Sequence, residues 1–408
     1  MAAVTWLRSP IGRADVHWAT RCGTKSILVL VPHIVAGTRL LDLLPLLEAD
    51  HRVQVAFTDP EAGENWQATH DFLRAQGGTV LPWAQARHSD VDLVLAGSTR
   101  GLDDLTAPAL LVPHGGGLGQ YRAWRPPPAT ARPHDPQLGL GPDQLIREGR
   151  VRADAIVLVH DQERDLLAEI CPRAVPAAVV AGDIALDRIA ASLLYRDRYR
   201  HALGATGDQQ VVVVTSTWSP RSAFGRHPDL FDRVLAALPR DGYRVVGALH
   251  PAIWSHHGSW QIRSWLAASL RAGLVLLPPE EGWRAALVAA DHLIGDYGSV
   301  TAYGAAAGAS ILLDDNPGQP LLCGTPAEVL ARHAPLWRPG RPLEPQLRAA
   351  TEARDAAGLP GLVQGLLTSR PGEAGLILRR TLYRLLNIPE PAHAVPVAPV
   401  PLPNPVTA

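Results

Sequence analysis

Residues suited to phosphate chemistry stand in four short polar segments of this chain, each directly after an apolar run. The segments are His114 with the glycines that follow it, Thr217 beside Trp218, His250 before Pro251, and the run Asp296-Tyr297-Gly298-Ser299. A histidine can take the proton of an attacking hydroxyl group, and hydroxyl groups with the free amides of a helix N-terminus can bind a diphosphate. These segments therefore predict transfer of a group from a phosphate-bearing donor, in a site that needs no metal ion.

The segment 296–299 has the clearest local context. A helix at 283–290, a buried strand at 292–294, a helix opening at Ser299 and a strand at 310–313 are expected around it. Ser299 can cap the second helix, and Gly298 lets a ligand approach the backbone. Two interpretations remain open: an anion site, or a plain turn with a helix cap.

Two series of alternating strands and helices are expected to position the polar segments. The first has strands at 26–32, 52–57, 79–81, 92–96, 110–113, 155–160 and 177–180, with helices at 39–48, 62–76 and 162–170. The second has strands beginning at 211, 244, 274, 292 and 310, with further helices at 228–237 and 259–271. Such continuous apolar strands indicate parallel sheets covered on both faces. We predict an α/β protein with two Rossmann-like domains facing across a cleft, where the carboxyl ends of the strands bind ligands.

The domain boundaries follow from the same pattern. We expect an acceptor domain at 1–203, a nucleotide-binding domain at 204–350, C-terminal helices at 351–387 and a Pro-rich disordered tail at 388–408. The last helix is expected to cross back to the N-terminal domain. The tail is expected to be extended or disordered, and it is either a site for a partner or a plain disordered end.

Composition narrows the function classes. The 408 residues carry a formal net charge of −1, which favours neither nucleic acid nor an anionic membrane as a partner. The three cysteines form no CxxC pair, so we expect free thiols and a reducing cytoplasm. No stretch of 18 apolar residues is present, which predicts a soluble protein without an integral membrane segment, cytoplasmic or peripheral to the membrane.

The order of these segments resembles the CDP-glycerol glycerophosphotransferases of teichoic acid synthesis, and actinobacterial proteins of this type. A His-Gly loop, a Ser-Thr-Trp element, a His-Pro pair and an Asp-Tyr-x-Ser turn follow one another between residues 113 and 313. The resemblance implies a GT-B fold and a cell-envelope polymer as the product. It also implies a CDP- or UDP-linked donor as substrate and no tightly bound cofactor.

Roles for individual residues follow from the resemblance. His114 matches the proposed general base on the acceptor hydroxyl, and His250 matches the histidine that contacts the donor phosphates. Ser299, with Gly298, Asp296 and the adjacent amides, matches the turn that holds the pyrophosphate, and Thr217 adds a hydroxyl group on the same side. The usual Ser-Ser of this turn is Gly298-Ser299 here, which removes one hydroxyl ligand and widens access to the backbone.

The acceptor side is less defined. His33 stands at the exit of the first strand, and Arg122 and Arg125 stand in a long Gly-, Pro- and Arg-rich loop. The arginines suit an anionic or ring-shaped acceptor, or they belong to a solvated insertion. Each histidine also has a purely structural interpretation. Two alternatives to the transferase remain: a UDP-sugar glycosyltransferase or epimerase of the GT-B fold, and an inactive protein that binds a nucleotide or a partner.

Overall fold

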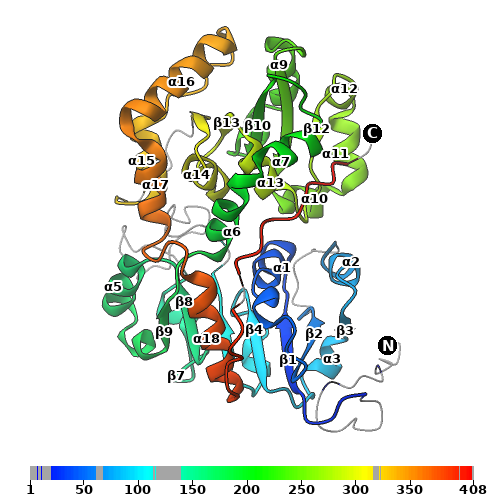
Figure 1. Cartoon of the computed structure of the whole chain (residues 1–408), viewed down its shortest axis with the longest axis vertical. Coiled ribbons are helices and arrows are strands. Elements are labelled where there is room, and N and C mark those ends of the chain that lie inside the picture. Colours follow the sequence, from blue (N-terminus) through cyan, green and yellow to red (C-terminus); the bar gives the residue numbers. More distant parts are fainter. Residues whose placement is uncertain are drawn as a thin grey trace. The chain divides into compact units, whose positions relative to one another are not determined.

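The computed structural model describes residues 7, 11, 20–60, 68–113, 115, 139–315, 321, 323–394 and 396–406. The chain divides into two compact units, shown in Figure 1. Unit 1 is formed by residues 1–114, 139–185 and 370–397, and unit 2 by 115–138, 186–369 and 398–408. The chain leaves unit 1 within helix α6 (Ile184–Ser192) and returns to it at Arg370.

Unit 1 is built on a seven-stranded sheet of order β3-β2-β1-β4-β5-β8-β9, in which all paired strands are parallel. The strands are β1 Lys25–Leu30, β2 Val53–Thr58, β3 Thr79–Leu81, β4 Leu93–Ala96, β5 Ala109–Leu111, β8 Ala155–Leu158 and β9 Ala178–Val180. Alternate side chains of β1 enter two different cores, because successive residues of a strand point to opposite faces. A small hairpin, β6 Ile146–Arg147 and β7 Arg150–Val151, stands apart from the sheet.

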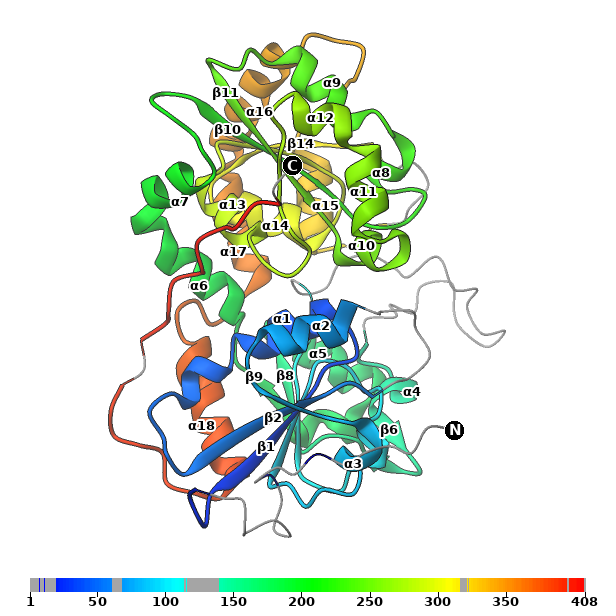
Figure 2. The same cartoon turned by 90° about the vertical axis from the view of Figure 1, so that its right-hand side faces the viewer.

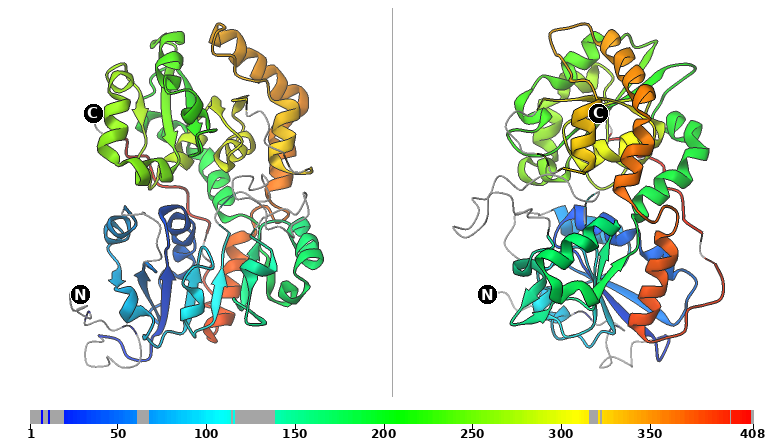
Figure 3. Two further views of the ribbon diagram at one scale, coloured as in Figure 1. Left: turned by 180° about the vertical axis from the view of Figure 1, so that it is seen from behind. Right: turned by 90° about the vertical axis from the view of Figure 1, so that its left-hand side faces the viewer.

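Helices cover both faces of this sheet. On one face α1 (Ile34–Leu41), α2 (Ala68–Ala75) and α18 (Ala374–Leu386) contribute to one core, and on the other α3 (Trp83–Ala86), α4 (Pro142–Leu145) and α5 (Asp161–Ile170) contribute to the second. The C-terminal helix α18 thus belongs to unit 1, as expected, and appears in orange-red beside the sheet in Figure 3. Two buried contacts hold it: Arg379 Nη1 donates to the Leu46 carbonyl at 2.7 Å, and the Tyr383 hydroxyl donates to Asp50 Oδ2 at 2.9 Å.

Unit 2 is built on a five-stranded parallel sheet of order β12-β11-β10-β13-β14. Its strands are β10 Gln210–Ser216, β11 Tyr243–Leu249, β12 Val275–Leu276, β13 His292–Gly295 and β14 Ser310–Leu313. Its further helices are α7 Arg196–Ala202, α8 Ala223–Arg226, α9 Leu230–Ala237, α10 Pro251–His257, α11 Ser259–Trp265, α12 Ala267–Arg271, α13 Trp283–Ala289, α14 Ser299–Ala306, α15 Pro326–His333, α16 Leu343–Ala357 and α17 Leu359–Leu367. Alternate valines of β10 again enter two cores. The prediction of parallel sheets covered on both faces is confirmed.

Helix starts account for most differences from the expected elements. The helix expected at 39–48 begins at Ile34, because the His33 side chain caps it by accepting from the Ala36 amide at 3.2 Å. The helix expected at 259–271 is α11 and α12, and α10 precedes them directly after β11. Pro251 at the first helical position favours that early start, and Gly258 separates α10 from α11 at a φ of 79°.

The Pro-rich C-terminal segment is extended, and its described residues 396–406 are held in place, so the expectation of disorder is corrected there. Val400 is buried; its amide donates to Ser192 Oγ at 2.9 Å and its carbonyl accepts from the Tyr199 hydroxyl at 2.7 Å. Val406 donates to the Leu276 carbonyl of edge strand β12 at 2.8 Å. Figure 3 shows this segment in red along the green helices α6 and α7. Proline content alone predicts an extended backbone, and these long-range contacts determine whether that backbone is ordered.

Removing residues 398–408 is therefore expected to destabilise unit 2. The truncation exposes the surface that Val400 covers and leaves Ser192 and Tyr199 without these partners, a loss of about 2–3 kcal/mol. The melting temperature should fall by about 4–10 °C in a thermal melt. Leu402→Ala, at a side chain that is 50% exposed, is the control and should change little. An unchanged melting temperature in the truncated chain would show that the segment adds no stability.

The described residues contain no helix long and apolar enough to cross a membrane. The cysteines are unpaired thiols; Cys171 is buried, whereas Cys22 and Cys323 are exposed.

Candidate functional site

The candidate site lies at the carboxyl edge of the unit 2 sheet, where strand order reverses. The parallel strands β10 and β13 are neighbours there, with Val212 paired to His292 and Val214 to Ile294. β11 continues the sheet on the other side of β10. The loops after β10 and β13 therefore begin side by side, at the position where open α/β sheets bind their ligands. Figure 2 shows α10 and α14 starting at the same end of this sheet.

Asp296, the first residue after β13, organises these loops. One of its oxygens, Oδ2, accepts from the Thr217 amide at 2.9 Å, the Thr217 hydroxyl at 2.7 Å and the Ala223 amide at 3.1 Å. The Asp296 carbonyl accepts from the Thr301 hydroxyl at 2.6 Å. Asp296 is 2% exposed, so its carboxylate binds the loops from the interior of the unit and presents almost no surface to a ligand. Asp296 therefore positions the Thr217 loop and the start of α8.

Gly298 and Ser299 form the N-terminus of α14. Gly298 takes the N-cap position, and Ser299 is the first helical residue, with no side-chain cap bond. The expectation that Ser299 caps the helix is therefore wrong, because Gly298 takes the N-cap position and Ser299 already lies within the helix. Ser299 is exposed. Thr301 and Ala302 donate to the Gly298 carbonyl, which leaves the amides of Ser299 and Val300 to face outward from the helix end.

Gly298 also has a packing role that the sequence did not indicate. A Cβ atom at this position would lie 2.8 Å from Thr217 Cγ2 and 3.4 Å from Asp296 Oδ1. Any side chain here would push the Thr217 loop away from the helix. The glycine thus brings Thr217 and the N-terminus of α14 into contact.

His250 caps α10 at the same edge. Its Nδ1 accepts from the Ala252 amide at 3.1 Å, and its own amide donates to the Ser216 carbonyl at 3.1 Å. Because Nδ1 is an acceptor, the neutral ring carries its proton on Nε2. The hydrogen-bonding pattern therefore assigns His250 a donor group at Nε2, which suits a phosphate oxygen and does not suit a general base.

A second carboxylate stands beside Asp296. Asp314, directly after β14, is buried and pairs with Arg226 at 2.6 Å and with His227 Nε2 at 3.1 Å. Burial raises the pKa of Asp296, and the negative charge of Asp314 raises it further, against the hydrogen bonds from Thr217 and Ala223. His227 is thus tied to a carboxylate 87 residues further along the chain.

Of the predicted acceptor and base residues, His33 lies among the described residues. His114, Arg122 and Arg125 lie outside the described residues. His33 caps α1 through Nδ1, as His250 caps α10. The structure brings Thr217, Asp296 and Gly298 together. Ser299 is the first residue of α14, directly after Gly298. His250 follows β11, the strand next to β10 in the same sheet.

Unit 1 holds a buried charged cluster at the carboxyl edge of its own sheet, which the sequence reading missed. Arg39 Nη1 and Asp183 Oδ1 are 3.1 Å apart, and Asp183 Oδ1 also accepts from the Ala185 amide at 2.9 Å. Glu163 Oε2 accepts from the Val159 amide at 2.7 Å, and burial raises the pKa of Glu163 to about 7. The pair Gly182-Asp183 after an apolar strand was a signal that could have been noticed. The described residues include no group of three or more His, Cys, Asp or Glu side chains placed to hold a metal ion.

Comparisons with known proteins identify the fold. No family model and no curated protein matches the chain. The solved structure of the wall teichoic acid polymerase TagF matches with a TM-score of 0.62 at 12% identity, over 90% of this chain and 90% of that chain. A variant of the polymerase soaked with CDPG matches with a TM-score of 0.60 at 13% identity, over 90% of each chain. The UDP-GlcNAc 2-epimerase from Neisseria meningitidis, bound to UDP-GlcNAc, matches with a TM-score of 0.53 at 13% identity, over 89% of this chain and 100% of that chain. The chain therefore has the GT-B-like fold of these enzymes.

Proposed function

We propose that this chain is a nucleotide-diphosphate-dependent transferase of the GT-B type, whose donor diphosphate binds at the N-terminus of α14. One observation carries the proposal: the buried Asp296, together with the close packing that Gly298 permits, holds Thr217 against that helix end at the switch point of the unit 2 sheet. The outward amides of Ser299 and Val300 and the positive end of the helix dipole favour a diphosphate there. The exposed Ser299 hydroxyl is available as a further donor.

The proposed reaction requires a base for the acceptor proton and a group that stabilises the leaving nucleotide. An acceptor hydroxyl oxygen attacks the donor at phosphorus or at the anomeric carbon, and its proton passes to a base. The nucleotide then leaves with its negative charge on phosphate oxygens, which the helix end and the Nε2–H of His250 stabilise. We assign the base to His114 and acceptor binding to His33, Arg122 and Arg125, in an acceptor domain at 1–203, and donor binding to a domain at 204–350.

The donor is proposed to be CDP- or UDP-linked. Both kinds of ligand occur in the titles of the matching structures, as CDPG with the polymerase and as UDP-GlcNAc with the epimerase. A glycerophosphotransferase acting on a cell-envelope polymer is the first candidate, since the polymerase matches with the higher TM-score. The epimerase match supports a second candidate, UDP-sugar epimerisation, which would release a new UDP-sugar with no acceptor present.

A thermal-shift screen against CDP, UDP, GDP, ADP and CDP-glycerol tests the proposal. A ligand that binds the folded state raises the melting temperature, so one nucleotide class should stabilise the protein selectively. His250→Asn should weaken that nucleotide about tenfold, because asparagine keeps an N-cap acceptor for Ala252 and removes the Nε2 donor.

His160→Asn is the matched control for this measurement. His160 caps α5 in unit 1 in the same way, with Nδ1 accepting from the Gln162 amide at 3.1 Å. Its substitution should leave nucleotide binding unchanged. If no nucleotide stabilises the wild-type protein, the proposed transferase function is wrong, and the result favours a protein that lacks this donor site. If His250→Asn binds as tightly as wild type, His250 has no contact with the donor.

A further inference from the structure

A small cavity opens at the amino edge of the unit 2 sheet, away from the proposed donor site. It has a volume of about 50 Å³, and Arg240, Tyr243, Arg244 and Gly273 are among its lining residues. Tyr243 is the first residue of β11 and pairs with Gln210, the first residue of β10, which places the cavity at the opposite end of these strands from Thr217. The volume holds a few water molecules or one phosphate-sized anion, and it is far below the several hundred Å³ of a nucleotide pocket.

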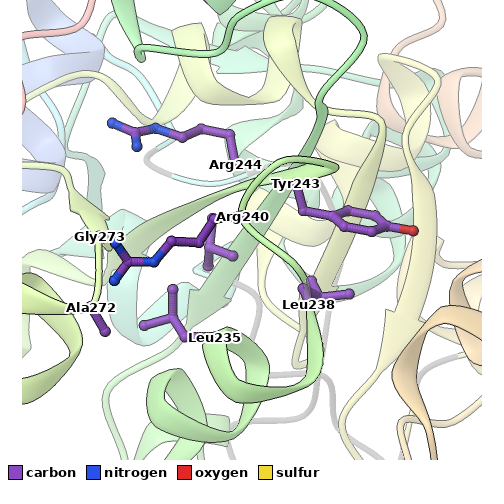
Figure 4. A pocket seen from close by; sticks show the side chains of 8 residues that line it. Leu235, Leu238, Arg240, Tyr243, Arg244, Ala272 and Gly273 are labelled. Carbon is purple, nitrogen blue, oxygen red and sulfur yellow. The ribbon is translucent and has the colours of Figure 1, made fainter.

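Two arginines face this cavity without a carboxylate partner. In Figure 4 the side chains of Arg240 and Arg244 extend toward the same side, whereas the Tyr243 ring points the other way. Arg244 Nε donates to the Leu203 carbonyl at 3.0 Å, and Arg240 Nη2 lies 3.5 Å from the Arg271 carbonyl. Neither guanidinium forms an ion pair with any residue that the structure describes.

Other arginines of the same edge are paired. Arg196 and Arg200 bind the two oxygens of Asp291, just before β13, at 2.8 and 2.7 Å. Arg240 and Arg244 differ in this respect from Arg196 and Arg200, because no ion pair balances their charge among the described residues. Burial lowers the pKa of Arg244, and the positive charge of Arg240 lowers it further, as expected for two cations that line one cavity. An anion bound there would offset their repulsion.

Two glycines help to position the guanidinium groups. A Cβ atom on Gly204 would lie 2.8 Å from Arg244 Nη2, and one on Gly273 would lie 3.4 Å from Arg240 Cζ. Both glycines have positive φ, 74° and 97°, so the backbone there disfavours other residues. Each guanidinium therefore occupies space that a side chain would take. Its nitrogens other than Arg244 Nε and Arg240 Nη2, which bind backbone carbonyls, are left for a ligand. The fork of an arginine matches the oxygens of a phosphate.

We propose that Arg240 and Arg244 form a binding site for one phosphate-sized anion, either inorganic phosphate or the phosphate group of a small monoester. Its occupation neutralises the cavity and stabilises unit 2. The site uses none of the residues of the proposed donor site, so it stands or falls independently of that function.

Thermal melts with increasing sodium phosphate, against sodium chloride at equal ionic strength, test this site. Phosphate at about ten times its dissociation constant should raise the melting temperature by about 3–5 °C beyond chloride. Arg240→Gln and Arg244→Gln should each abolish that difference. Arg263→Gln removes one exposed positive charge from α11, outside the cavity, and should retain it.

The controls separate this site from other effects of phosphate. Ser299→Asp blocks the proposed diphosphate site and should leave the phosphate shift intact. A general salt effect would persist in both cavity variants, and that result would overturn the proposal, as would equal effects of phosphate and chloride on the wild type. Ribose 5-phosphate distinguishes the two forms of the ligand: a larger shift than inorganic phosphate assigns the monoester, and a smaller one assigns the free ion.

Discussion

Asp296→Ala is expected to lower the free energy of unfolding of unit 2 by about 3–5 kcal/mol and to abolish nucleotide binding. The substitution leaves the Thr217 amide, the Thr217 hydroxyl and the Ala223 amide without their shared acceptor, Asp296 Oδ2. The Thr217 loop then lacks the hydrogen bonds that hold it against α14. Urea unfolding and a nucleotide titration measure the two effects.

Asp296→Asn is the matched control. The amide oxygen of asparagine can accept the same three hydrogen bonds. The substitution should therefore lower the free energy of unfolding by no more than about 2 kcal/mol at neutral pH. Because burial raises the pKa of Asp296, the wild-type protein loses stability as the pH rises from the unfolded pKa through the raised folded one, and Asn lacks this dependence. Equal losses in the Ala and Asn variants would mean that the hydrogen bonds at Oδ2 do not hold the loops.

Glu163 is expected to give unit 1 a pH-dependent stability. Burial raises its pKa from 4.5 to about 7, so the folded state holds a proton that the unfolded state releases. Its contribution is therefore fully present below pH 4.5 and is lost as the pH rises to about 7, by about 3 kcal/mol in total. Glu163→Gln should remove this loss. The difference in the free energy of unfolding between the variant and the wild type should therefore shift in favour of the variant by about 3 kcal/mol between pH 4.5 and pH 8.

Glu169→Gln provides the control, since Glu169 is an exposed glutamate on the same helix α5. Urea unfolding of the three proteins at several pH values gives the comparison. Parallel curves for wild type and Glu163→Gln would contradict a protonated, buried Glu163 at neutral pH.

Sequence periodicity was sufficient for the sheets and insufficient for the helix starts. Apolar runs such as 211–214 place a buried strand wherever they occur, because only a sheet covered on both faces buries every side chain. Strands β3 and β14 were predicted to the residue. The starts of α1 and α10 depend on histidine caps, which are rarer than caps by serine, threonine, aspartate or asparagine.

The candidate site was predicted as a set of segments, and its internal contacts were not. The order of Thr217, His250 and Asp296 along the chain was enough to place them at one sheet edge. That Asp296 binds the Thr217 loop across 79 residues, or that Asp314 pairs with Arg226 and His227, depends on strand order and loop conformation. The role of Gly298 likewise depends on an approach of the Thr217 loop that only the folded chain reveals.

Calorimetric titration of the wild type and of Ser299→Asp with the nucleoside diphosphate that the screen selects tests the central claim most directly. An acidic side chain at the first position of a helix stabilises that helix, so the variant should fold at least as well as wild type. It also places a negative charge where the diphosphate is proposed to bind, and affinity should fall at least about a hundredfold.

Ser259→Asp is the matched control, because Ser259 is also an exposed first residue behind a glycine N-cap, on α11. It should bind the nucleotide as tightly as wild type. Loss of affinity in Ser299→Asp alone is the result that the account predicts. Equal affinity in all three proteins would show that the donor diphosphate does not lie at the N-terminus of α14.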